Sequence, residues 1–295
     1  MSGHCIQIDL LPTTSQVVNA LQECLSAEEV DLRDVSYIAR HDPVVLINIM
    51  LLVNRSIQKS NRPVINTASA AINLLGLPAL KEALLAIKSV DDMELSKPQI
   101  CLFNLIRNRI FIAALMTEFW AEYMGEKNIE EQYCASMFTG LNSLYRCVQE
   151  KKLETRLSAE DSYLDSSNNL KSLYLFDKET IAILPDSIQQ VHANTSYTRR
   201  LSLTILSYEL VAALELGYSS LEFQHKLGRL IECIDQSASR ASYDFAIQVV
   251  QAERANPYAA WSHARYMVST NIERVDPLVA YIRAPQKQAQ CAGHR

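Results

Sequence analysis

The stretch ARHDPVVLINIMLLVNRS, residues 39–56, decides the fold of this chain. Asp42 and Pro43 carry its sharpest local signal, because Asp suits the residue that caps a helix and Pro suits the first helical position, where its missing N–H costs nothing. The run from Val44 to Val53 is apolar apart from Asn48, which predicts a helix that is buried on most sides. This helix is too short to span a bilayer, which takes about 20 apolar residues. We therefore expect it at the centre of a helical bundle.

Apolar residues recur at helical spacing on both sides of this stretch. They predict four more helices, at about 17–25, 32–39, 68–75 and 78–87. A hydroxyl of Thr13, Thr14 or Ser15 is expected to cap the first of them, and Gly76 fits the left-handed position that ends the third. Five helices joined by short loops within about eighty residues are typical of a packed α-bundle.

The central helix is expected to end at Asn54, Arg55 and Ser56. A polar side chain at the end of a buried helix must find hydrogen-bond partners. The simplest expectation is that Asn54 bonds to a nearby backbone group and fixes the following loop. The alternative is that it lines a small pocket.

Composition limits the class of protein. The 295 residues are 48% hydrophobic and include only seven glycines, which favours an all-α globular fold over a turn-rich β fold. The net charge of −5 gives no general attraction to nucleic acid or to an anionic membrane, so neither is an expected partner. The seven cysteines are scattered and form no CxxC pair, which predicts reduced thiols in a cytoplasmic protein rather than zinc sites or disulfides.

We predict a multi-helix bundle in two lobes. The predicted segments are an N-terminal helical lobe at 1–95, a second helical lobe at 96–256, and a C-terminal helix and tail at 257–295. The second lobe is expected to open with a long helix over 99–124, ended by Gly125, and to continue with another from 129 to about 153.

The order of motifs in the first lobe resembles the HDOD family (HD-related output domain) of bacterial signalling proteins, with this chain as a divergent member. The matching pieces are Leu11-Pro12, Asp42-Pro43, Leu51–Ser56 and Ala71–Gly76. The resemblance implies an all-α fold distantly similar to HD-type metal phosphohydrolases, and a role that is regulatory rather than catalytic. The candidate interaction or structural motif consists of Asp42, Pro43, Asn54, Ser56 and Gly76.

The same resemblance indicates where an HD enzyme would hold its metal. The first ligand His falls near Asn108 or Arg109, and the adjacent His-Asp pair falls on Thr139 and Gly140. His192 could occupy a further ligand position but has no partners, and residues 97–191 contain no histidine. Histidine and carboxylate are the ligands that a hydrolytic divalent metal needs. We therefore expect a degenerate metal site, no catalytic residue and no cofactor.

The sequence is compatible with three functions. The favoured one is a non-catalytic regulatory module that binds a protein partner of a signalling pathway. The alternatives are an HD-type metal-dependent phosphohydrolase with a rearranged site, and a nucleotide or second-messenger sensor that uses the cleft between the lobes. The sequence does not name the partner, and it leaves a homodimer open.

Overall fold

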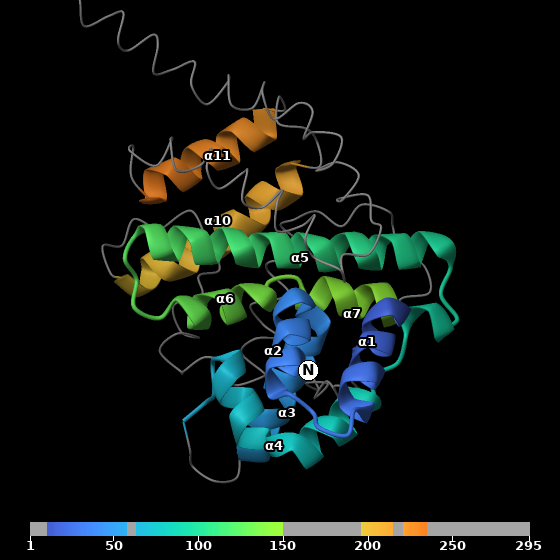
Figure 1. Ribbon diagram of the computed structural model, residues 1–295. Coiled ribbons are helices and arrows are strands. Elements are labelled where there is room, and N and C mark those ends of the chain that lie inside the picture. Colours follow the sequence, from blue (N-terminus) through green and yellow to red (C-terminus); the bar gives the residue numbers. More distant parts are fainter. Residues whose placement is uncertain (1–10, 58–62, 150–195, 215–220, 235–295) are drawn as a thin grey trace, which may run out of the picture.

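The computed structural model describes residues 11–57, 63–149, 196–214 and 221–234, and these ranges contain helices and no strand (Figure 1). The predicted all-α fold is confirmed. The elements are α1 (Ser15–Ser26), α2 (Leu32–His41), α3 (Pro43–Ile57), α4 (Ala68–Leu85), the short 3-10 helix η2 (Val90–Asp92), α5 (Lys97–Tyr123), α6 (Ile129–Met137), α7 (Leu141–Gln149), α10 (Ser196–Leu214) and α11 (Leu221–Ile234). His192 and the segment predicted at 257–295 lie outside the described residues.

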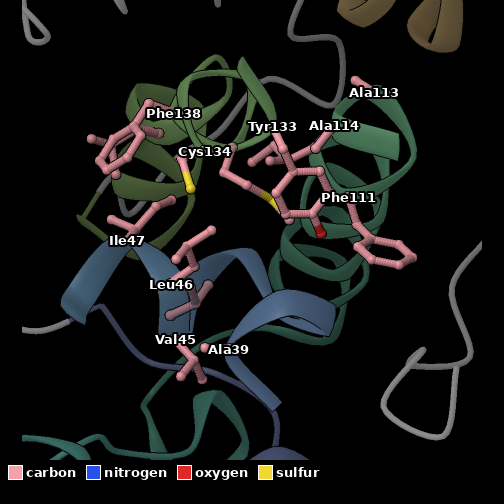
Figure 2. Packing of buried hydrophobic residues seen from close by; sticks show 14 of the residues in the cluster. Ala39, Val45, Leu46, Ile47, Phe111, Ala113, Ala114, Tyr133, Cys134 and Phe138 are labelled. Carbon is pink, nitrogen blue, oxygen red and sulfur yellow. The ribbon is translucent and has the colours of Figure 1, made fainter. Parts of the chain in front are cut away.

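The central position predicted for α3 is confirmed. Along this helix only Leu52, Arg55 and Ser56 are not buried. It packs against α2 and α4 on one side and against α5 and α6 on the other. Figure 2 shows Leu46 and Ile47 pointing toward the side chains of α6 and the turn after it.

The described helices fall into two groups. In the first group, α1 to α4 pack on one another; in the second, α5 lies against α6, α7 and α10, and α11 packs on α10 (Figure 1). The buried apolar side chains nevertheless form one cluster that extends from α1 to α11. Shared burial of this kind ties the two groups together, because separating them would expose apolar surface on both. The predicted lobe boundaries at 95 and 256 stay predictions.

Helix α4 is bent at Gly76, as its sequence predicted. Gly76 has φ +68° inside the element, and Pro78 then begins the second helical segment. A positive φ is accessible to glycine at little cost and is strained for residues with a Cβ. Gly125, which follows α5, also has φ +68° and ends that helix as expected.

The expectation of one continuous helix from 129 to about 153 is wrong. The chain turns at Phe138, Thr139 and Gly140, and this turn separates α6 from α7. The hydroxyl of Thr139 donates to the carbonyl of Ser136 at 2.7 Å. A side-chain bond of this type competes with the helical ladder and favours a break.

Among the residues that the structure describes, two helices are long and apolar enough to cross a bilayer when only length and composition are considered. They are α5, with 67% of its apolar window buried inside the protein, and α4, with 22% buried. The bent pair α2 and α3 passes the same test when it is counted as one span. For α5 the apolar composition is explained by core packing; for α4 it leaves apolar surface exposed.

Candidate functional site

The buried carboxylate of Asp42 is the polar centre of the contact between the two helix groups. Its Oδ1 accepts the backbone N–H of Val45 at 3.0 Å, which makes Asp42 the cap of α3. Its Oδ2 accepts the hydroxyl of Thr13 at 3.0 Å and an N–H of the Arg107 guanidinium on α5. Three donors from three separate parts of the chain therefore converge on one side chain, and we call Thr13, Asp42 and Arg107 the Asp42 joint.

Both charges of this joint are removed from water. The side chain of Arg107 is 2% exposed and that of Asp42 is 0% exposed. Removing one partner of a buried ion pair leaves an uncompensated charge, which typically destabilises by about 3–5 kcal/mol. The pair therefore fixes how α5 sits on the start of α3.

Two asparagines of α3 hold neighbouring chain segments in the same way. Asn48 accepts the backbone N–H of Leu11 at 3.1 Å and donates to the carbonyl of Leu11 at 3.0 Å. Asn54 accepts the N–H of Ile65 and donates to its carbonyl, each at 2.8 Å. The expectation that Asn54 bonds to backbone and fixes the following loop is confirmed.

The edge of the contact carries an aromatic and charged group. The Arg40 guanidinium pairs with Glu118 at 2.5 Å and lies 4.8 Å from the ring centroid of Tyr133. The hydroxyl of Tyr133 donates to the carbonyl of Arg40. Burial raises the pKa of Tyr133 well above its usual value, and burial likewise raises the pKa of the neighbouring Cys134 thiol to about 12. Both groups therefore stay protonated at neutral pH, and Cys134 is no reactive thiolate.

Two helix N-termini are capped by carboxylates from distant elements. The carboxylate of Glu130 on α6 accepts the backbone N–H of Ser69 at 2.9 Å and its hydroxyl at 2.8 Å, at the start of α4. Asp91 accepts the N–H and the hydroxyl of Ser15 at the start of α1. The expected local cap of α1 is wrong for Thr14, whose side chain makes no capping bond.

The positions aligned with HD metal ligands are packed with other side chains. Asn108 and Thr139 are buried, and a Cβ placed on Gly140 would lie 2.5 and 2.6 Å from two carbons of Ile110 and 3.1 Å from the hydroxyl of Tyr208. An aspartate could not occupy position 140 without displacing Ile110. Within the described residues no three His, Cys, Asp or Glu side chains come together as a metal site.

The structure separates the predicted motif residues into internal and surface positions. Asp42, Pro43 and Asn54 are buried, Ser56 is exposed, and Gly76 lies at the bend of α4. Sequence reasoning missed Arg107 and Thr13 as partners of Asp42. The available signal was a charged residue, Arg107, within a long apolar helix, where burial would require a carboxylate.

Comparisons with known proteins agree with this architecture. The family model of the HDOD domain matches residues 11–184, which is more than half of the chain. Among solved structures, the crystal structure of the MmoQ response regulator from Methylococcus capsulatus is similar, with a TM-score of 0.54 and 17% identity. The match covers 76% of this chain and 95% of that one, and at this identity it shows the fold alone. No curated protein matches the sequence.

Proposed function

Because this chain belongs to the HDOD domain family, we propose that it is a non-catalytic regulatory module that acts in signal transduction by binding a protein partner. The proposal assigns no reaction to the chain. Its helices form a platform, and the signal arrives through another protein.

The observation that carries the proposal is the packing at Gly140. An HD enzyme needs a carboxylate there, whereas this chain has a glycine whose missing side chain makes room for Ile110 and the hydroxyl of Tyr208. Thr139, at the aligned His position, uses its hydroxyl on the carbonyl of Ser136. The family resemblance would place metal chemistry at this position, and the side chains of Ile110 and Tyr208 that lie there support a non-catalytic role.

The bonding of the motif residues supports a platform role as well. The polar side-chain atoms of Asp42 and Asn54 bond to other parts of the same chain. Asp42 does so in the Asp42 joint, and Asn54 bonds to the backbone of Ile65. Side chains that are satisfied internally define the shape of a domain rather than its contacts. Partner recognition therefore falls to exposed residues, which include Ser56 of the motif but not Asp42 or Asn54.

The test uses the full chain purified gently from its own host. Native mass spectrometry measures the mass of the species that co-purify, and elemental analysis of the same sample measures bound Mn, Fe, Mg and Zn. We expect a bound second protein, no stoichiometric metal, and no hydrolysis of bis(p-nitrophenyl) phosphate when Mn²⁺ is added. The captured protein is then bound again from purified components, with unrelated helical protein as the matched control.

Two results would overturn the proposal in different ways. Stoichiometric metal together with phosphodiester turnover would make the chain a hydrolase with a ligand set that its sequence does not reveal. Saturable binding of a nucleotide without hydrolysis, with no protein partner, would make it a second-messenger sensor.

A further inference from the structure

The second segment of α4 presents a mixed face to solvent. Pro78, Lys81, Glu82 and Leu85 lie at i, i+3, i+4 and i+7, the spacing that places side chains on one side of a helix. Pro78, Glu82 and Leu85 are exposed, with Leu85 at 46%, and Lys81 is half-buried. Within the described residues, neither Lys81 nor Glu82 takes part in an ion pair. We call these four residues the α4 face.

The α4 helix is nearly as apolar as a core helix, but much less of it is buried. The 18 residues of α4 have a mean hydropathy of 1.3, close to the 1.5 of an 18-residue window of α5, yet 22% of α4 is buried against 67% of that window. Leu74, on the segment before the bend, is also 41% exposed. The fold therefore leaves apolar side chains of α4 exposed on both sides of its bend.

We propose that the α4 face binds the same face of a second copy of this chain, with the two helices antiparallel. A two-fold axis between positions 81 and 82 sets Lys81 of each copy opposite Glu82 of the other. The same axis sets Pro78 of each copy opposite Leu85 of the other. A two-fold interface must be complementary to itself, and this face meets that requirement in both charge and apolar contact.

The charge pattern favours a second copy over a bilayer surface. Helices that lie in a membrane interface are rich in Lys and Arg on their polar side and carry aromatic residues on the other. The α4 face has one cation, one anion and no aromatic residue, on a chain of net charge −5. A bilayer would leave Glu82 unpaired, whereas a second copy offers its Lys81 to the Glu82 of each chain, which gives two ion pairs per dimer.

The expected dimer is small and reversible. Eighteen helical residues extend about 27 Å at most, which places the contact below the area of about 800 Å² per partner typical of stable complexes. We therefore expect a monomer of 33.3 kDa at low concentration and twice that mass at high concentration. This inference goes beyond the proposed function and does not depend on it, since self-association requires no signalling partner.

Sedimentation equilibrium of the full chain over a range of concentrations tests the interface. Leu85→Glu should abolish the dimer. Lys81→Glu and Glu82→Lys should each weaken it by about tenfold or more, because each creates two like-charged contacts per dimer. The double variant Lys81→Glu/Glu82→Lys should restore the wild-type affinity, since it regenerates both pairs with the charges exchanged.

Leu221→Glu is the matched control, because Leu221 is 84% exposed on α11, away from α4. It should leave the dimer intact, and circular dichroism should show that every variant keeps its helical content. A wild-type monomer at all concentrations would overturn the proposal, as would a dimer that survives Leu85→Glu. Failure of the double variant to recover would place the contact elsewhere. Co-flotation of the wild type with phosphatidylglycerol vesicles, lost in Leu85→Glu, would assign the face to a membrane instead.

Discussion

Helix α5 meets the rest of the protein in two contrasting ways within one turn. At Arg107 it places a charged group in the core, against Asp42. At Ile110 it places an apolar side chain against Gly140, with no room for a Cβ. The Arg107 contact can stay charged because the carboxylate of Asp42 accepts three hydrogen bonds. The Ile110 contact leaves no space for a polar side chain at position 140. The difference teaches that α5 keeps a buried charge where it orients two helices and uses close apolar packing one turn further on.

The largest effect is expected when the polar contact is broken. Arg107→Met should lower the free energy of unfolding by about 3–5 kcal/mol, because it leaves the buried carboxylate of Asp42 without its cation. Urea denaturation followed by circular dichroism measures this loss. Asp42→Asn in the same chain should recover part of it, because Asn still caps a helix and carries no charge. If Arg107→Met alone kept a stability close to wild type, the Asp42–Arg107 pair would not be what orients α5.

The packed contact should respond to volume instead of charge. Gly140→Ala should destabilise by about 1–3 kcal/mol, since the added methyl group meets Ile110. Gly228→Ala on α11 is the matched control, because no atom lies within 4 Å of its Cβ position; there the gain in helix propensity should stabilise by about 0.5–1 kcal/mol. Equal effects of the two changes would contradict close packing at position 140.

A smaller effect is expected at the long-range cap of α4. Glu130→Gln should destabilise by about 0.5–1 kcal/mol, because an amide loses both one acceptor and the favourable charge at the helix N-terminus. For a chain of this size, that corresponds to a fall of about 2 °C in Tm by thermal denaturation. Glu94→Gln, at an exposed position outside the helices, should leave Tm unchanged. A similar fall in both variants would indicate a general charge effect.

The smallest expected effect is on the pH dependence of stability, through His41, whose ring lies near Phe111 of α5. The ring of His41 lies near those of Tyr37 and Phe111 in tilted contacts, with ring centroids 4.2 and 5.9 Å away. Burial lowers its pKa from 6.5; the carbonyl of Tyr37 opposes this change, and Arg40 adds to it. The unfolded chain therefore binds the proton first as pH falls below about 6.5, so stability declines on acidification. His41→Phe should reduce the acid-side loss of Tm relative to wild type; an unchanged pH profile would show that His41 is not responsible.

Features that depend on neighbouring residues were predictable from the sequence. The Asp42-Pro43 start of α3, its burial, the backbone bond of Asn54 and the bend at Gly76 all follow from local backbone chemistry. The break between α6 and α7 was not predicted, because the apolar pattern continues through it. Neither were the caps that Asp91 and Glu130 supply, since each acts on a helix more than sixty residues away.

The sequence by itself determined an all-helical chain, the identity of its central helix and the absence of His-Asp at positions 139 and 140. Only the tertiary structure decided which charges meet in the core, what fills the space at Gly140, and that α4 keeps an exposed apolar side. The physical reason is range. Helix capping and apolar periodicity depend on residues close together in the sequence, so the sequence reveals them. Burial and ion pairing depend on which distant segments the folded chain brings together.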